Sequence, residues 1–96
     1  MGDQKHLEEL AQFIREHRGN EQHFDALFSK LQAETEAEQS FSDEAGVQYK
    51  NGLQEALDKY AVPYKENREK GISTWSEFET FVSYFEKSVI EAMHGN

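Results

Sequence analysis

The chain has 96 residues and a formal net charge of −9, from ten Lys and Arg against nineteen Asp and Glu. It contains no Cys, which excludes disulfide frameworks, CxxC redox pairs and thiolate zinc sites. The excess of acids argues against direct nucleic-acid binding, because phosphate recognition needs clustered Lys and Arg. A length of this order is typical of a single domain, and we expect one over residues 1–96.

The first third of the chain has the apolar spacing of two amphipathic helices. Residues 4–17 repeat apolar groups three and four positions apart, at Leu7, Leu10, Ala11 and Ile14. Gly19 and Asn20 then predict a helix stop followed by a new N-cap. From Glu21 the pattern restarts, with Phe24, Leu27, Phe28 and Leu31 on one face.

The secondary structure of the middle of the chain is less clearly predicted by the sequence. Residues 33–39 read AETEAEQ, which fits either an exposed helical end or a polar loop. Residues 40–44 offer two N-caps, Ser40 and Ser42, followed by acids that favour a helix N-terminus. A third helix is expected from Ala45 to Ala61. Pro63 should end or kink it, because Pro has no N–H to donate to the preceding turn, and residues 65–71 are expected to form a polar connector.

The C-terminal helix has the clearest signals in the sequence. Thr74 and Glu77 have the spacing of a capping box, in which each side chain bonds to the other residue's backbone N–H. The helix that follows carries a broad aromatic stripe on Trp75, Phe78, Val82, Phe85, Val89 and Ala92. No segment alternates with a period of two. The predicted fold is therefore all-α, a small antiparallel helical bundle of four helices.

An acidic run is the most distinctive feature of the chain. Between Gln32 and Tyr49 there are five acids and no Lys or Arg. We expect this run to dock electrostatically on a basic surface of another protein, because opposite charges speed association. The same run would also suit a solvated helix end that keeps the protein soluble. Its acids are Glu34, Glu36, Glu38, Asp43 and Glu44.

A different hypothesis places the interaction on the last helix. Its apolar arc is wider than one side of a bundle needs, so the surplus could form a homodimer seam or receive a partner helix. Phe81, Tyr84 and Met93 would carry that contact. The alternative reading is that these residues belong to the core.

The sequence offers little support for a metal-binding or catalytic site. The four histidines His6, His17, His23 and His94 are scattered, although His17 and His23 flank a predicted turn and could approach each other. Glu91 and His94 make one E-x-x-H pair, whereas di-iron bundles need two such pairs and further Glu. We expect no metal, no cofactor and no enzymatic activity, and a small-ligand or metal-binding bundle is the third alternative.

Taken together, these patterns predict a small acidic, non-enzymatic protein-interaction domain of the inhibitor, immunity or regulatory type. The expected partner is a protein with a basic surface. No apolar run is longer than three residues, as at Tyr60–Val62, which is far too short for a membrane span. Because a secretory h-region and Cys are both absent, we expect a cytoplasmic protein.

Overall fold

The computed structural model describes residues 2–37 and 44–94, which form four helical segments and no strand. The first segment is α1, Gly2–His17. The second begins with a 3₁₀ turn, η1 (Glu21–His23), and continues as α2, Phe24–Glu36. The third joins α3 (Glu44–Glu55), η2 (Ala56–Ala61) and α4 (Val62–Glu69), and the fourth is α5, Trp75–His94. The predicted all-α bundle of four helices is confirmed.

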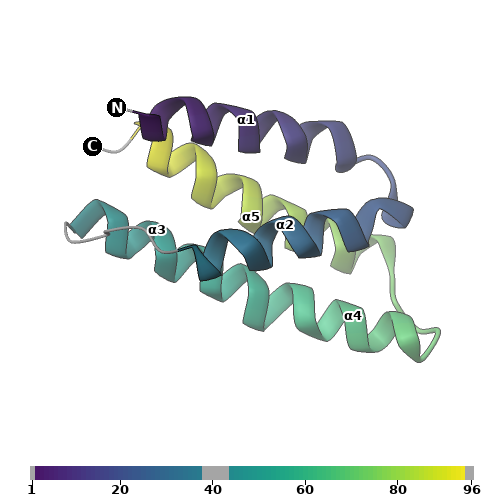
Figure 1. Cartoon of the computed structure of the whole chain (residues 1–96). Coiled ribbons are helices and arrows are strands. Elements are labelled where there is room, and N and C mark those ends of the chain that lie inside the picture. The colour runs from purple at the N-terminus through teal and green to yellow at the C-terminus, as the bar shows by residue number, and fades with distance from the viewer. Residues whose placement is uncertain (1, 38–43, 95–96) are drawn as a thin grey trace.

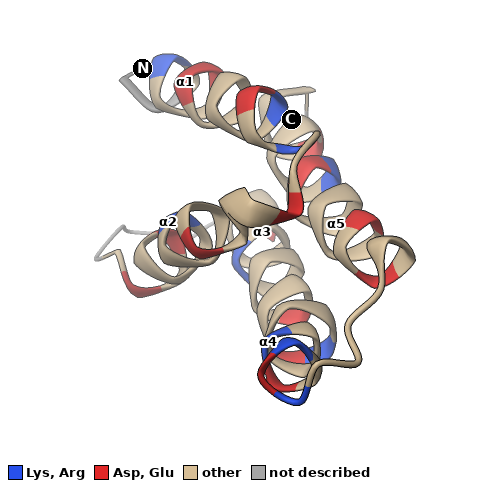
Figure 2. Ribbon diagram, turned by 90° about the vertical axis from the view of Figure 1, so that its right-hand side faces the viewer, with Lys and Arg blue, Asp and Glu red and all other residues tan. Residues whose placement is uncertain are grey.

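The four segments run antiparallel in a body of 42 × 22 × 19 Å (Figure 1). Helix α5 packs along α1 on one side and along α3 and η2 on the other. Helix α2 lies against α3, η2 and α1, and each of these contacts is smaller than the contact between α1 and α5. Viewed from the end in Figure 2, α1 and α2 stand further apart than α1 and α5. Helix α1 therefore packs more closely on α5 than on α2.

The core is built around the aromatic stripe of α5. Phe78, Phe81 and Phe85 are fully buried, and Phe81 meets the ring of Phe24 from α2 edge-on at 5.5 Å. Phe24 also packs on Tyr64 of α4, with ring centroids 4.9 Å apart. Aromatic rings supply large buried areas. This cluster therefore compensates for the low aliphatic content of the chain.

Three predicted helix boundaries are confirmed. Helix α1 ends at His17, and Asn20 Oδ1 accepts a hydrogen bond from the backbone N–H of Gln22 at 2.8 Å. Before α5, Thr74 Oγ1 accepts from the Glu77 N–H at 3.2 Å, while Glu77 Oε1 accepts from the Thr74 N–H at 3.0 Å. Between these ends, α4 ends at Glu69, and Gly71 in the turn that follows has a φ of 76°, the left-handed conformation that glycine adopts freely.

Pro63 was expected to end or kink the third helix, and it does not end it. The helix passes through Pro63, which lies in the first turn of α4, and continues to Glu69. The preceding segment η2 is π-helical, and the Val62 N–H donates to the carbonyl of Leu57, five residues back. This wider turn is a local adjustment of the hydrogen-bond ladder just before the residue that cannot donate. The expected connector over 65–71 is accordingly wrong for residues 65–69, and the loop covers residues 70–74.

The ambiguous stretch 33–39 is helical as far as Glu36, and Ala37 is already extended. Residues 38–43, with the predicted caps Ser40 and Ser42, lie outside the described residues. Within the described ranges, no helix combines the length and apolar character that crossing a membrane requires.

Candidate functional site

The acids singled out in the sequence fall into three groups in the structure. Glu36 at the end of α2 and Glu44 at the start of α3 are exposed. Glu38 and Asp43 lie outside the described residues. Glu34 is only 7% exposed, so its carboxylate is not part of the accessible acidic surface.

The buried carboxylate of Glu34 joins three helices. Its Oε1 is 2.8 Å from Nε2 of His6 on α1, and its Oε2 accepts a hydrogen bond from the Tyr49 hydroxyl of α3 at 2.8 Å. Both carboxylate oxygens are thus satisfied, as a buried acid requires. Burial and the neighbouring Glu34 charge raise the pKa of Tyr49 well above its ordinary value. Glu34 therefore has a structural role.

The sequence did contain a signal for this burial. Phe24, Leu27, Leu31 and Glu34 continue one stripe at spacings of three, four and three, so Glu34 occupies a core-facing position of the helix. Its charge led it to be grouped with its neighbours along the chain. Periodicity was the better guide at this residue.

The exposed acids near Glu34 belong to three different elements. The bonds from Glu34 to His6 and Tyr49 bring the start of α1, the end of α2 and the start of α3 together at one end of the bundle (Figure 1). Four exposed carboxylates lie among the described side chains of these segments, and none forms an ion pair with another described residue. We refer to them as the acidic end: Glu8, Glu9, Glu36 and Glu44.

Elsewhere in the described residues three acids form ion pairs with Lys or Arg, and Figure 2 shows acids and bases side by side on α4. Arg18 pairs with Glu86. Arg68 reaches Asp25 at 3.3 Å. Residues 59–70, which include α4, carry four Lys or Arg against two Glu, so the negative charge of the molecule is unevenly distributed.

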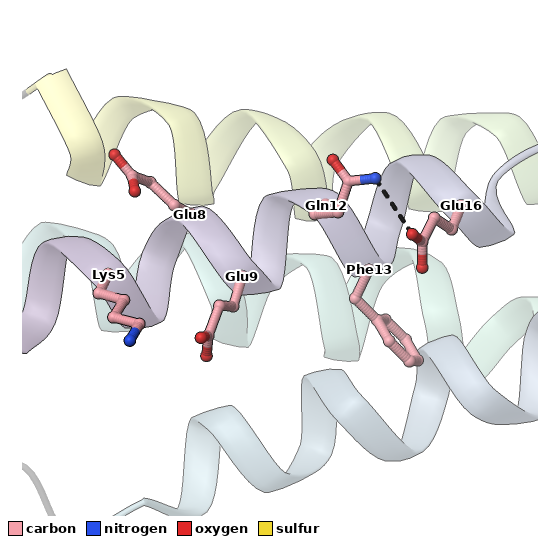
Figure 3. A pocket seen from close by; sticks show the side chains of 6 residues that line it. All are labelled: Lys5, Glu8, Glu9, Gln12, Phe13 and Glu16. Atoms are coloured by element: carbon pink, nitrogen blue, oxygen red, sulfur yellow. Dashed lines mark hydrogen bonds between the residues drawn. The ribbon is translucent and has the colours of Figure 1, made fainter.

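A shallow hollow on α1 adjoins the acidic end. Its volume is about 440 Å³, and all six of its lining residues come from α1. Figure 3 shows them in two rows with a spacing of four residues, and Gln12 Nε2 donates to Glu16 Oε2 at 3.1 Å. We call this feature the α1 hollow; it is lined by Lys5, Glu8, Glu9, Gln12, Phe13 and Glu16. Sequence reasoning missed it, because it treated α1 only as a core helix.

The three residues of the alternative apolar interface on α5 differ in how far they are buried. Phe81 is fully buried in the core and offers no surface to a partner. Tyr84 is partly buried and stacks on Tyr60 with ring centroids 4.3 Å apart, and Met93 packs against the core from its edge. Among the described residues, the large apolar side chains that face solvent are Val47, Ile72 and, in the first turn of α5, Trp75.

The histidines do not assemble into a metal centre. His17 and His23 do approach each other, as predicted, with ring centroids 5.0 Å apart. Nδ1 of His17 bonds to the carbonyl of Phe13, and the buried Nδ1 of His23 has no hydrogen-bond partner among the described residues. Within that part of the chain, no three His, Asp or Glu side chains gather in a group that could hold an ion.

Comparison with known protein families, curated proteins and solved structures gave no match to this chain. The function is therefore inferred from the surface of the molecule itself.

Proposed function

We propose that the chain is a non-enzymatic protein-interaction domain of the inhibitor, immunity or regulatory type, which docks through its acidic end on a basic surface of a partner protein. The carrying observation is that the exposed carboxylates of Glu8, Glu9, Glu36 and Glu44 lie at one end of the bundle without ion pairs. The described cations in the same segments are Lys5 and Lys50.

An uneven charge of this kind favours association with a basic surface. A concentrated negative field steers an oppositely charged partner into the correct orientation and raises the association rate. Carboxylates already paired within the molecule contribute less to that field. The unpaired acids at this end therefore supply more of it than Glu86 and Asp25, whose charges are balanced by arginines.

The supporting experiment compares two triple charge reversals of equal size. One reverses the acidic end, with Glu9→Lys, Glu36→Lys and Glu44→Lys. The matched control carries Glu66→Lys, Glu69→Lys and Glu79→Lys, which reverse three exposed acids on α4 and α5. Each variant and the wild type are used to capture partners from cells of the native source, and the affinity for the captured protein is then measured.

The proposal predicts a basic partner whose affinity falls about a hundredfold or more with the first variant, since each reversal turns an attraction into a repulsion. The control variant should lose much less affinity for this partner. Equal losses with both variants would mean that overall charge, rather than the acidic end, governs binding, and the proposal would be rejected. Circular dichroism of all three proteins checks that the helices remain intact.

A further inference from the structure

The α1 hollow has the surface form that receives a second helix. Its two rows, Lys5–Glu9–Phe13 and Glu8–Gln12–Glu16, each follow an i, i+4 ridge of the helix, and the hollow lies along the groove between them (Figure 3). Helices pack by setting the side-chain ridge of one into such a groove of the other. The hollow spans roughly 17 Å along the axis, at about 1.5 Å per residue, which corresponds to three helical turns.

Phe13 gives this groove an apolar anchor that is already held in place. Its ring is partly buried and stacks on the His17 ring at 4.1 Å. The ammonium of Lys30 lies 4.9 Å from the ring centroid on the side of α2. A side chain restrained in this way loses little conformational entropy when a partner contacts it, and aromatic anchors commonly dominate binding energy.

The charges around Phe13 indicate what kind of partner helix would fit the hollow. Three carboxylates line the hollow, from Glu8, Glu9 and Glu16, against the single ammonium of Lys5. Two copies of this surface would place like charges against each other, which opposes self-association through it. A partner with Lys or Arg on both sides of an apolar side chain would match both the carboxylates and Phe13.

We infer that the α1 hollow binds a basic amphipathic helix of the partner protein, which seats an apolar side chain against Phe13 and sets its cations beside Glu8, Glu9 and Glu16. This inference rests on the proposed function and adds to it the secondary structure of the bound segment and its apolar contact. Such helix-in-groove recognition is a general mode of protein binding.

The test uses two synthetic helical peptides of equal length and equal lysine content. One carries leucines at i, i+4 and i+7, and in the other those leucines are replaced by glutamine. Burying one or two apolar side chains should make the leucine peptide bind wild type at least tenfold more tightly. In wild type, the amide NMR shifts that change most on binding should lie within residues 5–16.

Two alanine variants supply a matched comparison. Phe13→Ala should remove most of the advantage of the leucine peptide. Phe28→Ala should leave it unchanged, although Phe28 is likewise a partly buried ring beneath a lysine, with Lys65 Nζ 5.3 Å from its centroid. Melting curves establish that both variants fold, and the NMR map of wild type needs no variant.

Equal binding of the two peptides would overturn the inference, and so would shifts centred outside α1 or a failure of both peptides to bind. The proposed function is tested separately by the captured partner. If that partner loses affinity with the reversed acidic end while the two peptides bind alike, the electrostatic proposal stands and the helix-in-groove inference fails.

Discussion

Among single residues, Glu34 shows that a carboxylate's role depends on the helix face it occupies more than on its neighbours in the chain. Glu34 and Glu36 are two positions apart, and only Glu36 reaches solvent. On a helix two positions correspond to about 200°, so the residues point to nearly opposite sides. Counting acids along the chain therefore overstates the accessible charge, whereas tracing the apolar stripe separates buried from exposed acids.

Tyr49 leads to a prediction about alkaline stability. Its pKa is raised in the folded protein, so the native state keeps the phenolic proton when the unfolded chain has lost it. The contribution of this group is fully present below about pH 10 and is lost as pH rises further, by about 1.4 kcal/mol per pH unit. Tyr49→Phe should lower the free energy of unfolding at about pH 8. Above about pH 10, the stability of this variant should decline less steeply than that of wild type.

Urea unfolding of wild type and Tyr49→Phe at a series of pH values between about 8 and 11 measures this difference. The gap in unfolding free energy between the two proteins should narrow as pH rises. Other groups that titrate in this range are common to both proteins and cancel in the comparison. A gap that stays constant would show that Tyr49 is not held in its protonated form by the fold.

At the level of helices, sequence patterns predicted where most elements begin and end because the signals are local. The capping box at Thr74 and the N-cap at Asn20 each depend on residues within one turn, and both formed as expected. Whether the helix continues through Pro63 depends on more than the missing N–H of proline. Burial of Ala61 and Tyr64 on either side favours a continuous helix, and the π turn in η2 accommodates the missing N–H.

The contact between α3 and α5 gives a prediction at Gly52. A Cβ at this position would lie 2.6 Å from Ser88 Oγ and 3.3 Å from Ser88 Cβ. Alanine favours a helix over glycine by about 1 kcal/mol, whereas overpacking costs about 1–3 kcal/mol. We expect Gly52→Ala to destabilise the protein by about 1 kcal/mol, measured by thermal or urea unfolding.

A double-mutant cycle identifies the cause. In a Ser88→Ala background the closest atom is gone, so Gly52→Ala should cost clearly less than it does in wild type. Gly19→Ala is a suitable control, because a Cβ there has nothing within 4 Å. If Gly52→Ala is as harmless as Gly19→Ala, the two helices do not approach as closely as described.

Over the whole molecule, composition and periodicity were enough to predict the fold class, because a helical bundle follows from local apolar spacing. The candidate site was only partly predictable. Glu36 and Glu44 were named from the sequence, whereas Glu8 and Glu9 join them only because the bundle brings α1 to the same end. The α1 hollow, whose lining comes from α1 alone, was not predicted because the sequence pattern of α1 was used only to identify its core face.

The salt dependence of the association rate tests the electrostatic account most directly. Stopped-flow measurement with the captured partner, from about 0.02 M to about 0.5 M NaCl, separates association from dissociation. We predict that the association rate constant of wild type falls at least tenfold over this range, with a much smaller fall for the acidic-end reversal. An association rate constant that does not change between the lowest and the highest salt concentration would contradict the account.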